Sequence, residues 1–211
     1  MTIQPAPAAS ALNLSDLPHL VLCRHGQTDW NAEGRLQGQE EIDINERGRA
    51  EARRNGRRLA ERLGAAASSF RFLASPMRRT RETMRLVRAE MGLDPEAYET
   101  DPRLVELSFG DWQGSTLQEV EAREPTAIIE REAGKWTFRP PGERAESYDM
   151  LAARVAPVFA ELDRPTVMIA HGGTIRSFLK LYTGLDAATA AHRPIPQDRF
   201  IEVENGVMHW R

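Results

Sequence analysis

The sequence predicts an α/β fold with three layers, in which an open, mainly parallel sheet carries helices on both faces. Three apolar runs lead to this prediction, at residues 20–23, 70–74 and 166–170, and each is followed by a helical pattern. Short apolar runs between Gly, Pro or polar residues are typical of buried strands. Strands that alternate with helices are typical of a parallel sheet, and right-handed crossovers bring the carboxyl ends of its strands to one edge.

The expected elements of the first half are a strand at 20–23, a loop at 29–44, a helix at 46–63, a strand at 70–74 and a helix from 75 to 91. Asn45 is the predicted N-cap of the first helix, and Gly64 is its predicted end. We expect Ala50, Leu59 and Leu63 to form the stripe of this helix that faces the interior, while its Arg and Glu side chains face water.

The second helix has a start signal of its own. Ser75 is expected at its N-cap and Pro76 at its first position, and Gly92 follows its end at Met91. Arg79 then lies in the first helical turn, where unpaired backbone N–H groups favour an anion.

The expected elements of the second half are a strand-like piece at 104–107, a helix from a capping box at 115–118 to 123, a helical piece from 125 to 133, a loop at 135–144, a helix at 146–162, a strand at 166–170 and a helix at 172–182. Pro157 is expected to kink or break its helix. Residues 199–210 predict a hairpin with a tight turn at Asn205-Gly206.

Composition limits the class of protein. The 211 residues, 41% hydrophobic and 28% charged, fit one catalytic domain at 19–211 behind a mobile tail at 1–18 that lacks the features of a signal peptide. No stretch approaches the roughly 20 apolar residues of a membrane span. The net charge of -3 gives no overall attraction to nucleic acid or anionic lipid. The single Cys23 fits a reducing compartment, so we expect a cytoplasmic protein without nucleic-acid or membrane partners.

The candidate site begins at Arg24-His25-Gly26, directly after the first predicted strand, where open α/β sheets bind ligands. A guanidinium can hold phosphate oxygens, and a neutral imidazole can serve as nucleophile, base or metal ligand. Gly26 would let the backbone approach a bound anion. By itself the tripeptide would favour an Arg on an ordinary solvated loop next to a His that only caps the strand. Partners near other strand ends favour a site: Arg79 after residues 70–74, Glu106 within residues 104–107, and His171 after residues 166–170.

Five ordered motifs carry a family resemblance: RHGQTDWN, GRLQG, SPMRRTRET, VELSFGDWQG and AHGGTIR. Together they span about residues 20–183, and in this order they resemble the histidine phosphatase superfamily, also called the phosphoglycerate mutase-like family. The resemblance implies a phosphomonoesterase that hydrolyses a small phosphorylated metabolite through a phosphohistidine.

The resemblance also implies a role for each catalytic residue. Arg24 and Arg79 would clamp the phosphoryl oxygens, and His25 would attack phosphorus. His171, protonated near the dianion, would donate to an oxygen. Glu106 would be the general acid for the leaving group and would later activate water, for which its pKa would have to be raised by burial or by the phosphate. Residues that would line the phosphate pocket are Thr28, Asn31, Gln37, Gly38 and Gly172.

Three alternatives remain open. His25, His171 and Glu106 could in principle bind a metal, but two adjacent arginines would repel a cation, so we expect no metal and no cofactor. A cofactor-dependent mutase would share the first half reaction. Gln27-Thr28 resembles the phosphatase branch, and the 65 residues from Glu106 to His171 (171 minus 106) leave less room for the insertion that encloses a mutase substrate. A non-catalytic module that binds phosphorylated ligands is disfavoured because none of the five catalytic groups is missing.

The cover segment between Glu106 and His171 contains further basic residues. Any of these could meet a second anionic group of the substrate: Arg123, Arg131, Lys135, Arg139 and Arg144. The identity of the substrate is not encoded in the motifs.

Overall fold

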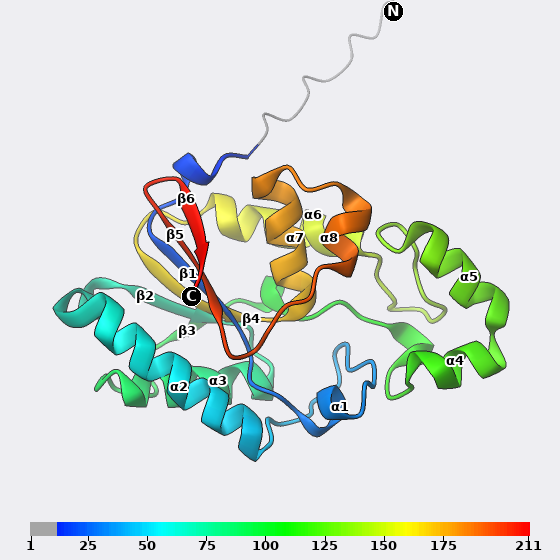
Figure 1. The fold of residues 1–211 in the computed structure, drawn as a ribbon, viewed down its shortest axis with the longest axis horizontal. Helices are drawn as coiled ribbons and strands as arrows, with labels where there is room; N and C mark the ends of the chain where they lie inside the picture. Colours follow the sequence, from blue (N-terminus) through cyan, green and yellow to red (C-terminus); the bar gives the residue numbers. More distant parts are fainter. Residues whose placement is uncertain (1–11) are drawn as a thin grey trace, which may run out of the picture.

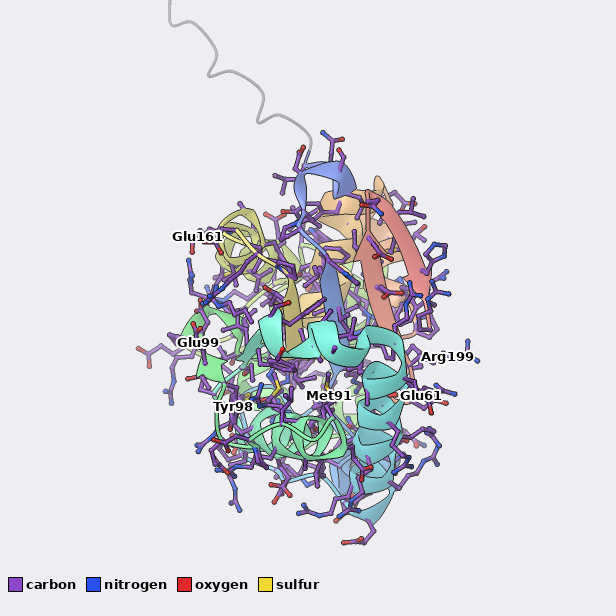
Figure 2. All side chains as sticks on the ribbon, turned by 90° about the vertical axis from the view of Figure 1, so that its left-hand side faces the viewer. Glu61, Met91, Tyr98, Glu99, Glu161 and Arg199 are labelled. Atoms are coloured by element: carbon purple, nitrogen blue, oxygen red, sulfur yellow. The ribbon has the colours of Figure 1, made fainter. Side chains whose placement is uncertain are left out.

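A computed structural model describes residues 12–211. Within this range a six-stranded sheet has the strand order β3-β2-β4-β1-β5-β6. The strands are β1 (Leu20–Arg24), β2 (Arg71–Ala74), β3 (Glu99–Thr100), β4 (Thr166–Ala170), β5 (Phe200–Glu204) and β6 (Val207–Trp210). β1 to β4 run parallel, β5 runs antiparallel to its neighbour β1, and β6 runs antiparallel to β5. Figure 2 shows Glu99 of β3 and Arg199, just before β5, on opposite sides of the molecule, as this strand order requires.

Helices cover both faces of the sheet (Figure 1). Their bounds are α1 (Asp29–Ala32), α2 (Glu46–Leu63), α3 (Arg78–Glu90), α4 (Leu117–Arg123), α5 (Pro125–Gly134), α6 (Tyr148–Ala160), α7 (Gly172–Thr183) and α8 (Ala187–His192). Short 3-10 turns occur at Leu14–Asp16, Gly64–Ser69, Pro102–Leu104 and Gly110–Trp112.

The alternation of side chains along β1 separates two cores. Leu20 and Leu22 pack in the cluster formed with α6, α7 and α8, whereas Val21 and Cys23 pack in the cluster formed with α2 and α3. Successive strand residues point to opposite faces, so one buried strand supplies both cores. The predicted three-layer α/β/α architecture is confirmed.

The inward stripe of α2 was predicted in part wrongly. Ala50 is exposed, whereas Ala52 is buried, as are Leu59 and Leu63. Small residues allow α2 to lie close to α3, since a Cβ on Gly56 would lie 2.8 Å from Cβ of Glu90. This close packing therefore determines which side of α2 faces the interior.

The start of α3 and the capping box of α4 are both shifted from their predicted positions. α3 begins at Arg78, with Met77 as N-cap and without a side-chain cap, because the hydroxyl of Ser75 contacts His171 instead. The capping box of α4 is formed by Thr116 and Glu119, one residue later than predicted.

Residues 104–107 do not form a strand. Their backbone groups bond to side chains, as when Arg154 donates to Val105 O, and the edge strand is β3 at Glu99–Thr100. The short helices α1 and α8 were not predicted.

Pro157 was predicted to kink or break its helix, and the break does not occur, because α6 continues through Pro157 to Ala160. The hairpin turn has positive φ angles at Asn205 (51°) and Gly206 (76°), the geometry that favours an Asn-Gly pair.

Part of the predicted tail at 1–18 lies against the domain. Residues 1–11 of the tail lie outside the described residues. Leu14–Asp16 form a 3-10 turn, and Leu17 is buried in the core, so residues 12–18 pack on the domain because their leucines are apolar.

Candidate active site

Two histidines meet at the carboxyl ends of β1 and β4. These strands are parallel neighbours, and Arg24 lies opposite Ala170 in their register. The N–H of His25 donates to Ala170 O at 3.0 Å, and His171 precedes α7. The two imidazole rings lie edge to face, with centroids 5.3 Å apart. Pairing of the strands thus brings together side chains that lie 146 residues apart in sequence (171 minus 25).

The imidazole of His25 is held in one tautomer. Nδ1 lies 2.8 Å from the carbonyl oxygen of Gly26, which can only accept, so Nδ1 carries the hydrogen and Nε2 keeps its lone pair. Burial lowers the pKa of His25 well below its usual value of 6.5, and the charges of Arg79 and Arg24 lower it further. The ring is therefore neutral at pH 7, the form that a nucleophile requires.

Gly26 serves packing rather than anion binding. Its N–H donates to the hydroxyl of Thr83 at 3.0 Å and is not free for a ligand. A Cβ at this position would lie 2.3 Å from the carbonyl oxygen of Gly48 in α2. The glycine that the sequence prediction connected with a bound anion instead lets the loop touch α2.

His171 is fully buried. Its Nε2 lies 2.8 Å from Ser75 Oγ, whereas Nδ1 has no hydrogen-bond partner among the described residues. Burial lowers the pKa of His171 well below 6.5, followed by the effects of Arg79 and His25. Burial and the neighbouring positive charges thus disfavour the protonated form that was expected from the sequence. A bound phosphate dianion would favour that form.

Arg24 and Arg79 are anchored by their outer nitrogens. Arg24 Nη1 donates to Ile195 O at 2.9 Å, and Arg79 donates to Glu40 O at 2.8 Å and to Gly38 O at 2.7 Å. The Nε atom of each guanidinium is buried without a partner among residues 12–211. Burial is the main cause that lowers the pKa of each to about 10, so both are charged at pH 7. Two fixed cations with unused donors form a site for an anion.

Glu106 is held by backbone N–H groups. Oε1 accepts from Leu107 N at 2.9 Å, and the N–H of Gly173 points at both oxygens, at 3.2 and 3.1 Å. The carboxyl group interacts electrostatically with Arg24 and Arg79. It therefore faces the place where the arginines would hold a phosphoryl group.

A pair of side chains from α6 and the preceding loop braces the segment that carries Glu106. Arg154 binds Glu146 with two contacts, of 3.0 and 2.6 Å, and donates to Val105 O at 2.9 Å. Glu146 Oε2 accepts from the N–H of Ser108 at 3.2 Å. This Glu146–Arg154 brace thus fixes the backbone on both sides of Glu106.

A cavity of about 140 Å³ opens beside these groups. Its lining consists of Arg24, His25, Asn31, Arg35, Leu36, Gln37, Gly38, Arg79, Glu106, Phe109, Tyr148, Gly172 and Arg176. Four of the five expected pocket residues are among them, and Thr28 is not. Thr28 is fully buried and caps α1, where its hydroxyl accepts from Asn31 N at 3.1 Å. It therefore positions Asn31 instead of lining the cavity.

Sequence reasoning missed several lining residues. Arg176 lies within the motif AHGGTIR, one helical turn after Gly172 and so on the same face of α7, and this spacing could have identified it. Arg35 lies within the motif GRLQG. Phe109 lies within the motif VELSFGDWQG, whereas Tyr148 has no comparable sequence signal.

The arrangement can be compared with known proteins. A profile of the histidine phosphatase superfamily (branch 1) matches residues 20–210. This chain belongs to the histidine phosphatase superfamily.

Other histidine phosphatases resemble the chain over most of its length. It is 37% identical to the glucosyl-3-phosphoglycerate phosphatase of Mycobacterium tuberculosis, over 74% of this chain and 71% of that protein. It is 32% identical to the metal-independent phosphoserine phosphatase of Arabidopsis thaliana (84% and 72% covered). It is also 35% identical to the 2,3-bisphosphoglycerate-dependent phosphoglycerate mutase of Methylobacterium radiotolerans (80% and 81% covered).

A solved structure gives the same assignment. The structure of mycobacterial glucosyl-3-phosphoglycerate phosphatase complexed with VO3 aligns with a TM-score of 0.75 and 30% identity, covering 92% of this chain and 96% of that one. The predicted phosphatase of the histidine phosphatase type is confirmed by these similarities. Among residues 12–211, no helix is both long enough and apolar enough to span a bilayer.

Proposed function

We propose that this histidine phosphatase transfers the phosphoryl group of a small metabolite first to Nε2 of His25 and then to water. The hydrogen bond from His25 Nδ1 to Gly26 O carries the proposal, because it leaves Nε2 with a lone pair at the mouth of the cavity. The unpartnered Nε atoms of Arg24 and Arg79 support it, since they offer donors for the phosphoryl oxygens.

In the first half reaction the bond from Nε2 of His25 to phosphorus forms while the bond from phosphorus to the ester oxygen breaks. The departing oxygen takes a proton from Glu106, which a high-pKa alkoxide requires. Arg24, Arg79 and a protonated His171 stabilise the charge on the three equatorial oxygens.

In the second half reaction a water molecule attacks the phosphorus of the phosphohistidine. Glu106, now without its proton, accepts a proton from that water, and the bond from phosphorus to His25 breaks. Inorganic phosphate leaves, and both side chains return to their starting protonation states.

The nucleophile can be tested by rapid acid and base quenching with a ³²P-labelled substrate. We expect an acid-labile, base-stable label in the parent and in His192→Ala, a variant at a histidine of α8 outside the cavity lining. His25→Ala should carry no label. Label of the same stability in His25→Ala would show that another residue is the nucleophile.

Mutase activity is the second candidate, because one relative is a phosphoglycerate mutase. Phosphatase activity predicts phosphate release without a bisphosphate primer. Primer-dependent interconversion of 2- and 3-phosphoglycerate that is faster than phosphate release would reverse the assignment.

The metabolite itself is best sought with a screen of phosphorylated compounds that includes the substrates in the relatives' names, glucosyl-3-phosphoglycerate and phosphoserine. The cytoplasmic location stays a prediction from the single Cys23, which is buried and unpaired.

A further inference from the structure

Arg176 is a cation of the cavity wall that no acidic side chain of residues 12–211 neutralises. Its Nε donates to Arg193 O at 2.9 Å, and its Nη1 lies 3.4 Å from the hydroxyl of Tyr148. No carboxylate of the described residues forms an ion pair with it. Arg24 lies near it with a charge of the same sign: burial is the main cause that lowers the pKa of Arg24, and the charge of Arg176 is the next.

Lys135 adds a second charge of this kind. It follows α5 on the cover segment, is partly buried, and makes no hydrogen bond or ion pair within residues 12–211. Burial lowers its pKa to about 8, and the charges of Arg131 and Arg176 add to the effect. The ammonium group of Lys135 and the guanidinium group of Arg176, of which the latter lines the cavity, thus repel each other.

Of the other basic candidates of the cover segment, Arg144 is exposed and lies outside the lining of this cavity, and the remaining three have partners. Arg123 is exposed and bonds to the hydroxyl of Ser115. Arg139 donates to two backbone carbonyls, and Arg131 contacts Glu132.

Four arginines line the cavity, and one of them is paired with acidic side chains. Arg35, in the same cavity wall, forms ion pairs with Glu33 and Glu119. Partly buried charges in proteins are normally paired, and unpaired ones of the same sign in a cleft favour a ligand of opposite charge.

We propose that Arg176, with Lys135 beside it, binds a second anionic group on the leaving portion of the substrate. The substrate class is then a phosphomonoester that carries a carboxylate or another phosphate, with the phosphoryl group on Arg24 and Arg79. The planar guanidinium of Arg176 suits either anion, because both accept two parallel hydrogen bonds. This inference rests on the proposed phosphatase function and names the class of its substrate.

The test compares esters that differ in one charge. 3-Phosphoglycerate and glycerol 3-phosphate differ by a carboxylate, and propane-1,3-diyl bisphosphate and 3-hydroxypropyl phosphate differ by a phosphate. The quantity measured is the ratio of kcat/KM within each pair, for the parent, Arg176→Met, Lys135→Met and the matched control Arg123→Met. A ratio cancels any loss of folded protein, because both esters meet the same enzyme preparation.

In at least one pair we expect the parent to have a higher kcat/KM for the ester with the additional anionic group. The expected ratio is roughly tenfold to a hundredfold, the contribution of a hydrogen bond between charged groups. Arg176→Met should bring that ratio close to one, Lys135→Met should lower it less, and Arg123→Met should leave it unchanged. The ester pair that shows the preference identifies whether the second anionic group is a carboxylate or a phosphate.

A parent that hydrolyses p-nitrophenyl phosphate but shows ratios near one would overturn the inference and leave the phosphatase function standing. An equal ratio in the parent and Arg176→Met would overturn it as well. A parent that releases phosphate from none of these esters, p-nitrophenyl phosphate included, would overturn the proposed function and the inference with it.

Discussion

The backbone N–H of Gly173 donates to both carboxylate oxygens of Glu106, and the space above Gly173 is occupied by the same carboxyl group. A Cβ at position 173 would lie 2.2 Å from Oε1 of Glu106 and 2.8 Å from Cδ2 of Leu151. Gly173, the second residue of α7, thus sets the position of the proposed general acid. A side chain at position 173 must displace Glu106.

Gly173→Ala is therefore expected to lower kcat for an alkyl phosphate by roughly 100-fold or more, the contribution of general acid catalysis. Gly134→Ala is the matched control, since a Cβ there meets only Thr137 Oγ1 at 3.4 Å, an ordinary contact. Steady-state phosphate release, with thermal unfolding to check the fold, measures the effect. Full activity in Gly173→Ala would mean that Glu106 is not held in a catalytic position by this contact.

The Glu146–Arg154 brace should act through Glu106. Arg154→Lys keeps the charge and loses the two-pronged contact, so we expect alkyl phosphates to be cleaved more slowly while the burst with p-nitrophenyl phosphate is nearly spared. Glu161→Gln is the control, because Arg103 and Glu161 form an exposed two-contact pair that also joins the segment before Glu106 to α6. Equal slowing of both substrate types in Arg154→Lys would point to a general structural defect.

Glu106→Gln separates the two duties of the carboxyl group. Cleavage of an alkyl phosphate should slow by roughly 100-fold to 10,000-fold. Nitrophenolate leaves without a proton, so an aryl phosphate should give a burst of nitrophenolate near one equivalent. Slow turnover should follow, because without Glu106 the water that hydrolyses the phosphohistidine is not activated. Pre-steady-state absorbance measures the burst. If alkyl and aryl bursts slow equally, Glu106 only shapes the pocket, and Asp111 is the next residue to test.

The lowered pKa of His171 predicts how the stability of the protein depends on pH. Its pKa in the folded protein lies well below the usual 6.5, mainly through burial, so below pH 6.5 the unfolded chain binds a proton that the folded chain does not. Stability is then lost as the pH falls. Between pH 7.5 and 5.5 this histidine should cost about 1.4 kcal/mol of the free energy of unfolding. Urea titrations of the parent and His171→Gln at both pH values measure the difference, and an identical loss in the two proteins would refute it.

Turnover is expected to persist in EDTA, because the buried cations Arg24 and Arg79 would repel a divalent ion at the phosphoryl site. A potential metal-binding group of His19, Glu202 and Glu204 lies elsewhere, on the sheet, and there Arg62 and Arg211 already bind Glu202. Phosphate release after prolonged dialysis against chelator measures this. Loss of turnover that a divalent ion restores would show that a metal takes part.

Much of the fold follows from local patterns. The apolar runs of β1, β2 and β4 were predicted because burial on both faces of a sheet requires continuous apolar residues. The bounds of α2 and the Asn205-Gly206 turn follow from interactions within a few residues. One failure shows the limit of local patterns: Ala50 and Ala52 are equally suited to a helix, and only the folded structure buries Ala52 and exposes Ala50.

For the site, the sequence by itself determined which residues stand at strand ends, and a fixed register then made the meeting of His25 and His171 predictable. Tertiary structure alone decided the side-chain partners: Ser75 with His171, Arg154 with the backbone beside Glu106, and Arg176 with Tyr148. These partners come from elements whose mutual placement depends on the volumes of many core residues. Hydrogen bonds between side chains of different packed elements cannot be predicted from the residues that are adjacent in sequence.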